Sequence, residues 1–204
     1  MFYVIGLGNP GEEYEETRHN AGRMAVEAFA KRTDLPDFVP NKKAAGLISQ
    51  GEVSSTDVRP KITEKVTAIL PETFMNKSGG SVSPFITSVK KAEQLIVVHD
   101  DLDMPLGKIK ILFNRGAGGH RGVESIRKAI KTEAFIRVKI GISPTTPSGK
   151  IKKPDSEKIL DFIVGKFKKP ELDIMKKTAK EAAEAIETIV LFGKEKAAEI
   201  FNQR

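Results

Sequence analysis

Apolar and polar residues alternate between two kinds of segment along this chain. Short apolar runs, typical of buried strands, are followed by stretches in which apolar residues recur at helical spacing. The pattern predicts strands at residues 2–5, 44–53, 65–70, 95–98, 108–113 and 136–142. It predicts helices at residues 18–32, 78–89, 120–131, 159–164 and 170–192, with a last turn or two after Gly193. Strands that alternate with helices indicate an α/β protein, and the short connections favour a mixed sheet.

Prolines and glycines mark the loops between these elements. Pro36 and Pro40 predict a loop at residues 34–43, and prolines among lysines and small residues predict a mobile loop at residues 145–154. No Gly/Ser-rich linker and no internal repeat divides the sequence. We therefore expect residues 1–204 to form one domain, since a chain of this length can bury one sizeable core.

The composition excludes several classes of chemistry. The chain has no cysteine, which excludes thiolate nucleophiles, disulfides and cysteine-ligated metals. No segment reaches the ~20 apolar residues that a membrane-spanning helix needs, and the N-terminus lacks the pattern of a signal peptide. We expect a cytoplasmic protein that does not associate with membranes.

The net charge of +7 is unevenly distributed. Residues 107–149 carry nine basic and two acidic side chains, whereas residues 1–30 are net acidic. The basic residues of this window are Lys108, Lys110, Arg115, Arg121, Arg127, Lys128, Lys131, Arg137 and Lys139. Such a cluster fits the phosphates of a nucleic acid. An ordinary solvated basic face explains it equally well.

Residues 6–22, GLGNPGEEYEETRHNAG, connect the first predicted strand to the first predicted helix. Pro10 and Gly11 mark a turn, and Thr17 is a predicted N-cap, so His19 falls in the first helical turn. The positive end of a helix disfavours imidazolium, and we therefore expect His19 to be a neutral proton acceptor near neutral pH. Asn9, at the end of the strand, can reach the same cleft.

The same segment contains G-x-G-x-x-G at residues 6–11, the fingerprint of dinucleotide-binding proteins. Its context argues against that function. Pro10 lacks a backbone N–H that pyrophosphate would need, and the glutamates at positions 12, 13, 15 and 16 would repel it. A nucleotide-dependent oxidoreductase is therefore the weakest of the functional hypotheses.

The three histidines, His19, His99 and His120, each lie at the boundary of a predicted element. Asp100, at the end of a buried strand, can accept a hydrogen bond from an imidazole and stabilise the imidazolium that forms during general-base catalysis. A cap or turn role explains Asp100 equally well. The sequence HDDLD at residues 99–103 also fits a metal site, but adjacent strand residues point to opposite faces, and we expect no metal.

Hydrolysis by an activated water is the simplest chemistry that these residues support. The sequence has neither a thiol nor a G-x-S-x-G serine elbow, which leaves histidine as the base. The carboxamides of Asn9 and Asn76 can donate hydrogen bonds to a developing oxyanion. Met75 is either a core residue or part of a pocket wall.

Four motifs, GLGNPGEEYEETRHNAG, PETFMNKSGG, HDDLDMPLGKIKI and GAGGHRG, occur in an order and at spacings that resemble the bacterial-type peptidyl-tRNA hydrolase family. The resemblance is close over residues 1–142. It implies a single α/β domain in which helices surround a twisted mixed sheet. It also implies a monomer, without metal, cofactor or obligate protein partner, that hydrolyses the ester between a peptide and the 3′ ribose of tRNA and so recycles tRNA from prematurely released peptidyl-tRNA.

The resemblance also implies roles for the residues at matching positions. His19 would be the general base that activates water, and Asp100 would orient it. Asn9 and Asn76 would bind and polarise the ester, and His120 would lie near the tRNA acceptor end. The residues implied to line the peptide groove are Tyr14, Phe74 and Met75.

Two positions depart from the family pattern. Arg121 stands where the family most often has asparagine, and Leu112 stands where some relatives have a basic residue that grips the acceptor phosphate. We expect Arg121 to hold a terminal phosphate or the ribose of the tRNA. Lys110, Arg115 and Lys139 are the remaining candidates for phosphate contacts.

The main alternative is a non-catalytic RNA-binding module, since some relatives of this fold serve as RNA-splicing cofactors. That alternative requires Asn9, His19, Asn76 and Asp100 to be retained for architecture alone. The enzyme is therefore the leading hypothesis.

Overall fold

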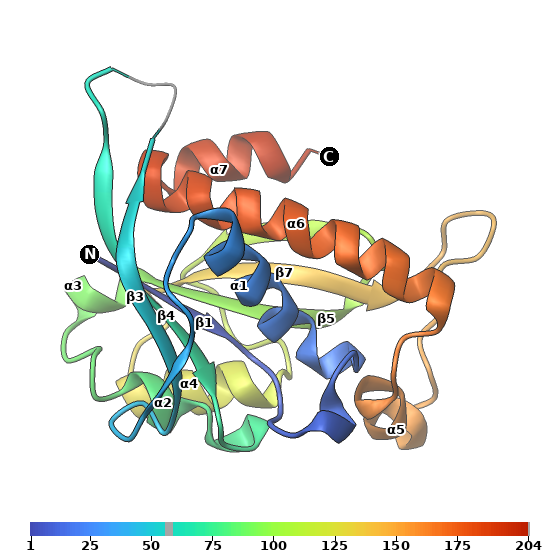
Figure 1. The fold of residues 1–204 in the computed structure, drawn as a ribbon. Coiled ribbons are helices and arrows are strands. Elements are labelled where there is room, and N and C mark those ends of the chain that lie inside the picture. The colour runs from blue at the N-terminus through green and yellow to red at the C-terminus, as the bar shows by residue number, and fades with distance from the viewer. Residues whose placement is uncertain (56–58, 204) are drawn as a thin grey trace.

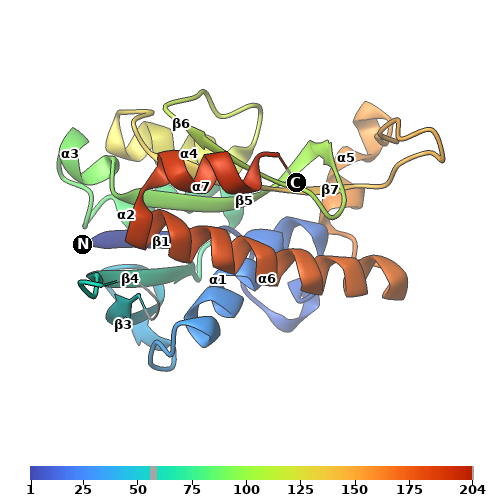
Figure 2. The ribbon, with the colours of Figure 1, turned by 90° about the horizontal axis from the view of Figure 1, so that it is seen from above.

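The structure, a computed structural model, describes residues 1–55 and 59–203. Its elements pack around one mixed, twisted sheet (Figures 1 and 2). In these residues the sheet has seven strands in the order β2-β3-β4-β1-β5-β7-β6. The strands are β1 (Phe2–Gly6), β2 (Val39–Asn41), β3 (Gly46–Ser54), β4 (Thr63–Pro71), β5 (Leu95–Pro105), β6 (Ile109–Phe113) and β7 (Ile136–Ser143). The central strands β4, β1, β5 and β7 are parallel, and antiparallel pairs extend both edges. The predicted α/β class and mixed sheet are confirmed.

Helices cover both faces of the sheet. They are α1 (Ala21–Arg32), α2 (Gly79–Val82), α3 (Val89–Ala92), α4 (Arg121–Ile130), α5 (Ile159–Val164), α6 (Lys169–Phe192) and α7 (Lys194–Phe201). Helices α1, α6 and α7 lie on one face, α2 and α4 lie on the other, and α5 lies at one end of the sheet (Figure 1). No helix in the described part of the chain combines the length and the apolar character needed to cross a bilayer.

Alternation along the buried strands supplies a core to each face. In β1, Val4 packs with α1 and α6, whereas Ile5 packs with the residues of α2 and α4. The neighbouring strand β5 divides in the same way, with Val98 in the first core and Val97 in the second. This two-sided burial explains why both strands are continuous apolar runs in the sequence.

Two predicted elements differ from the structure. The predicted loop at residues 34–43 contains β2, in which Pro40 pairs with Leu47 at the edge of the sheet, where a missing N–H is tolerated. The predicted helix at residues 78–89 is two short helices instead, because Pro84 has no N–H with which to continue α2. Helix α3 then begins anew after Ser88, whose hydroxyl accepts from the N–H of Lys91 at 3.3 Å.

Helix α1 begins in close contact with the ends of β1 and β5. The N–H of Leu7 donates to the carbonyl of Val98 (2.9 Å), and the N–H of Arg23 donates to the carbonyl of Leu7 (3.0 Å). Gly22 lies between these groups, where an added Cβ would collide with the carbonyl oxygen of Val98. A glycine is therefore required here for α1 to bring the preceding turn, residues 18–20, to the end of β5.

We predict that Gly22→Ala lowers the free energy of unfolding by about 1–3 kcal/mol, because the backbone of β5 cannot move away from the new methyl group. Urea denaturation followed by circular dichroism measures the change. Gly80→Ala is the matched control, since Gly80 lies in α2 and none of the atoms described by the structure lies within 4 Å of an added Cβ. Equal stability of the two variants would contradict the prediction.

Candidate active site

A cavity of about 630 Å³ lies at the C-terminal ends of the parallel strands. Its wall comes from the segments that follow β1 and β4, from the end of β5, from residues 117–121 before and at the start of α4, and from α5. Ligands of open α/β sheets bind at this edge because the connecting loops of several strands converge there. Asn9, His19, Asn76 and Asp100, which are far apart in the sequence, all line this cavity.

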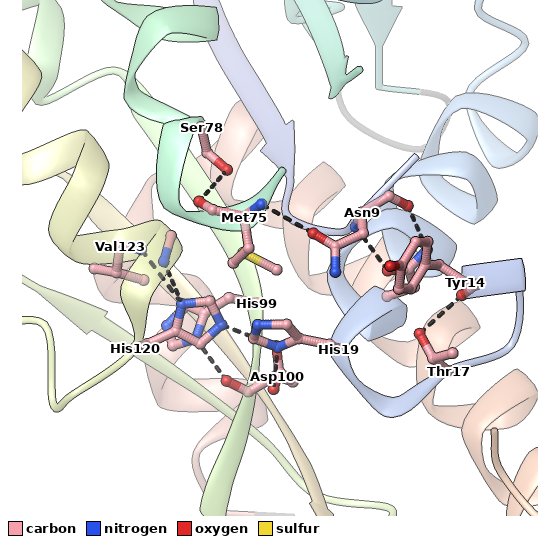
Figure 3. Close-up of polar contacts among 12 residues, drawn as sticks. Asn9, Tyr14, Thr17, His19, Met75, Ser78, His99, Asp100, His120 and Val123 are labelled. Carbon is pink, nitrogen blue, oxygen red and sulfur yellow. Dashed lines mark hydrogen bonds and ion pairs between the residues drawn. The ribbon is translucent and has the colours of Figure 1, made fainter. Parts of the chain in front are cut away.

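His19 and Asp100 form a buried hydrogen-bonded pair (Figure 3). His19 lies in a 3-10 turn, Arg18–Asn20, directly before α1, and its Nδ1 is 2.9 and 3.0 Å from the two carboxylate oxygens of Asp100. The side chains are only 8% and 4% exposed. Because a carboxylate accepts, Nδ1 carries the proton and Nε2 keeps its lone pair. The pair can therefore take a proton at Nε2.

His120 contacts the same carboxylate. Its Nε2 lies 2.9 Å from Oδ1 of Asp100, and its Nδ1 accepts from the N–H groups of Gly122 (3.2 Å) and Val123 (3.3 Å) (Figure 3). His120 is thus the N-cap of α4. Because Nδ1 accepts from the helix, the proton of the neutral ring must sit on Nε2, which donates to Asp100.

The two imidazoles control the charge of Asp100. Burial opposes ionisation of this carboxyl, but the attraction and the hydrogen bonds of His19 and His120 outweigh it and hold the pKa of Asp100 well below its ordinary value. Asp100 is therefore an anion in the folded protein. Asp100 thus has two imidazole partners, which a turn or cap residue does not need.

The expectation that His19 has a depressed basicity is wrong. Burial, the largest influence, lowers the pKa of His19, but the attraction and hydrogen bond of Asp100 together raise it above its ordinary value, and Arg121 opposes them. His19 precedes α1 rather than lying inside its first turn. A full negative charge at hydrogen-bond distance therefore outweighs the partial charge of a helix end.

Asn9 is held so that one amide donor remains free. Its backbone N–H donates to Oδ1 of Asn20 (2.8 Å), Nδ2 of Asn20 donates to its carbonyl (2.9 Å), and its own Oδ1 accepts from the N–H of Met75 (2.9 Å). Nδ2 of Asn9 has no hydrogen-bond partner among the described residues and points to the side of the cavity where His19 lies (Figure 3). The contacts of Asn20 with Asn9 were not predicted from the sequence, where its place next to His19 is the available signal.

Residues 74–76, which follow β4, line another part of the cavity wall. Met75 is buried in the core against Gly122 and also lines the cavity, so both of its predicted roles apply. Asn76 is exposed in the 3-10 turn Met75–Lys77, and Phe74 is 57% exposed. Tyr14 does not line the cavity but packs edge-on against Phe74, with ring centroids 6.5 Å apart.

The basic candidates divide into three environments. Arg121 is exposed and lines the cavity. Lys110 and Arg115 are exposed but lie outside the cavity, on β6 and in the segment that follows it. Lys139 forms an ion pair with Asp101, which makes it less available to a phosphate.

Three contributors to the site have roles that were not predicted from the sequence. His99 is buried, its Nδ1 donates to the backbone carbonyl of Asp100 (2.7 Å), and burial holds its pKa well below the ordinary value. Arg18 anchors the connection between α5 and α6, since it donates to Glu171 (2.7 Å) and lies 4.4 Å from the ring centre of Phe162. Helix α5 supplies an apolar wall. The apolar spacing of residues 159, 160, 163 and 164 was the available signal for it.

His19, Asp100 and His120 lie close enough together to be candidate metal ligands, with their ligand atoms within 4.8 Å of one another. The donor set does not fit a metal. A ligating Nε2 of His120 would need a lone pair, which would put a proton on Nδ1, directly against the N–H groups of Gly122 and Val123. The three groups therefore fit a hydrogen-bonded triad in which protons occupy the positions between them.

Known peptidyl-tRNA hydrolases are similar to this chain over nearly its full length. The family model "Peptidyl-tRNA hydrolase" matches residues 3–204. A peptidyl-tRNA hydrolase of Carboxydothermus hydrogenoformans is 38% identical over 204 residues, which cover 100% of this chain and 99% of that protein. One of Halalkalibacterium halodurans is 34% identical, with 99% and 98% covered. The crystal structure of peptidyl-tRNA hydrolase from Acinetobacter baumannii has a TM-score of 0.79 and 30% identity, and covers 100% of this chain and 93% of that chain.

We predict that NMR titration of the imidazole resonances finds the pKa of His19 above the ordinary ~6.5, and that Asp100→Asn moves it below that value. Without the carboxylate, burial and Arg121 both disfavour the charged ring and nothing compensates them. His99 is the internal control, because its buried ring is expected to stay neutral in both proteins. A His19 pKa that does not change in the variant would contradict the prediction.

Proposed function

The chain belongs to the peptidyl-tRNA hydrolase family, and we propose that it hydrolyses the ester between the peptide and the 3′ ribose of peptidyl-tRNA, with His19 as the general base. The observation that carries this proposal is the His19–Asp100 pair on the wall of the cavity, in which Nδ1 of His19 lies 2.9 and 3.0 Å from the two carboxylate oxygens and Nε2 keeps its lone pair. A base of this kind activates water without a covalent intermediate.

The proposed reaction uses one water and two proton transfers. Nε2 of His19 takes a proton from water as its oxygen bonds to the ester carbonyl carbon, and Asp100 stabilises the imidazolium. The free Nδ2 of Asn9 and the amide of Asn76 donate to the oxyanion of the tetrahedral intermediate. When the bond to the ribose oxygen breaks, the imidazolium returns its proton to that oxygen, and the products are a peptide acid and tRNA.

Substrate binding divides between two sides of the cavity. We propose that Phe74 and Met75 contact the peptide, with Tyr14 supporting Phe74 from the side. Arg121 would bind a terminal phosphate or the ribose, because it is the basic residue at the cavity wall. The net charge of +7 steers the polyanionic tRNA toward this protein.

Lys110 and Arg115 remain the candidates for phosphates farther along the acceptor stem. Both are exposed near the β6 edge of the sheet. Lys139 is a weaker candidate, because a phosphate would have to displace Asp101. Leu112 is half-buried and contributes no charge.

We further propose that residues 1–204 act as one domain and as a cytoplasmic monomer without a cofactor or an obligate protein partner, recycling tRNA from prematurely released peptidyl-tRNA. The alternative of a purely RNA-binding module is less well supported. Binding alone requires neither a free imidazole lone pair nor an ionised partner behind it.

We predict that His19→Ala lowers the rate of release of N-acetylated amino acid from N-acetyl-aminoacyl-tRNA by about 10²–10⁴-fold, the contribution of a positioned base. Binding of tRNA, measured by filter retention, is expected to survive, since His19 is buried and carries no phosphate contact. Turnover by the unmodified protein is expected to persist in EDTA. Full activity of His19→Ala would refute the assignment of the base.

We predict that Arg121→Ala raises KM for the same substrate about 10-fold, because one charged contact to the tRNA is lost. It is also expected to reduce the salt dependence of tRNA binding by about one phosphate contact. Arg127→Ala is the matched control. This substitution removes the same charge from α4, but the side chain that it removes is bound to Glu124. An unchanged KM for Arg121→Ala would show that Arg121 does not hold the tRNA.

A further inference from the structure

We propose that His120 is a positioning residue of the hydrolytic reaction, which acts through the carboxylate of Asp100 rather than on the tRNA. The proposal rests on the function proposed above and gives His120 a different role from the one that the sequence resemblance implies. Its evidence is the geometry of His19 and His120 around one carboxylate, with the ring of His99 packed against His120.

The first step is that one oxygen serves two imidazoles. Oδ1 of Asp100 lies 2.9 Å from Nδ1 of His19 and 2.9 Å from Nε2 of His120. A rotation of the carboxyl group that improves one of these bonds weakens the other. The bond from His120 therefore restrains the carboxylate in the plane that orients His19.

The second step is that His120 has no free nitrogen for a substrate. Nδ1 accepts from Gly122 and Val123 at the start of α4, and Nε2 donates to Asp100. The side chain is only 9% exposed. A direct contact to the tRNA would have to break either the helix cap or the bond to Asp100.

The third step is that packing holds the ring of His120 in this orientation. Its centroid lies 4.7 Å from that of His99, at an interplanar angle of 61°, and 5.1 Å from that of His19. His99 is itself fixed by the bond from its Nδ1 to the carbonyl of Asp100. Two rings and a helix cap therefore direct Nε2 of His120 at one oxygen.

The arrangement also sets the basicity of His19. Asp100 from β5 and Arg121 from α4 are the charged groups that act on this ring. From α5 the ionisable side chain is the exposed Asp161, and from the start of α1 it is Arg23, which is ion-paired with glutamates. The hydrogen bond from His120 to the Asp100 carboxylate weakens the attraction of that carboxylate for His19. Loss of the His120 side chain is therefore expected to strengthen the attraction and to raise the pKa of His19.

Two substitutions separate the two functions of the ring. In His120→Asn the amide oxygen takes the place of Nδ1 and keeps the cap of α4, since asparagine is a favoured N-cap, but the side chain is too short to reach Asp100. In His120→Gln the amide nitrogen takes the place of Nε2 and still donates to Asp100, whereas the cap is lost. The first variant tests positioning, and the second tests the cap.

We expect His120→Asn to keep its fold and its KM for N-acetyl-aminoacyl-tRNA, and to lose about 10- to 100-fold in kcat, the effect of one bond to a charged group. The acidic limb of its kcat–pH profile is expected to move to higher pH. We expect His120→Gln to keep most of kcat and to melt at a lower temperature. In an Asp100→Asn background, His120→Asn is expected to cause no further loss.

An unchanged kcat and pH profile in His120→Asn would overturn the proposal, as would a rise in KM alone or an equal loss in both Asp100 backgrounds. These outcomes differ from a failure of the proposed function, in which the unmodified protein would release no N-acetylated amino acid at all. Circular dichroism of each variant shows whether it is folded before its kinetics are compared.

Discussion

The carboxylate of Asp100 is the group on which the rest of the site depends. A buried anion is unfavourable unless hydrogen bonds and opposite charge compensate it, and here the compensation comes from His19 on one side of the sheet and His120 on the other. Each histidine belongs to a different helical segment, the turn before α1 and the cap of α4. The anion thus connects both helical layers at the end of β5.

The backbone geometry around this carboxylate explains how the layers meet there. Gly22 allows α1 to approach the backbone of β5, and Gly122 leaves room for Met75 beneath α4. Arg18, next to His19, anchors the segment that follows α5, the helix whose residues line the cavity. The elements that bury the core are therefore the same ones that position the reacting groups.

Local patterns predict most of the fold. The continuous apolar runs of β1 and β5 and the helical spacing of α6 were readable in the sequence, because burial on two faces or one face leaves a period in the residues themselves. Two predicted elements are wrong. The predicted helix at residues 78–89 is interrupted by Pro84, and the predicted loop at residues 34–43 contains a strand that pairs at the edge of the sheet. The basicity expected for His19 is also wrong, because the full charge of Asp100, 81 positions away in the sequence, outweighs the partial charge of the helix end.

The sequence by itself determined the α/β class, the order of most strands and helices, and the residue types available for chemistry: imidazoles, carboxamides and carboxylates without a thiol. These follow from short-range periodicity and composition. Only the tertiary structure decided which of these groups meet. Parallel strands bring Asn9, Met75 and Asp100 to one edge through crossovers of many residues, and hydrogen-bond distances across those crossovers set the tautomer of His120, the charge of Asp100 and the basicity of His19. Such quantities depend on separations of a few ångströms between distant parts of the chain, and no local pattern of residues encodes them.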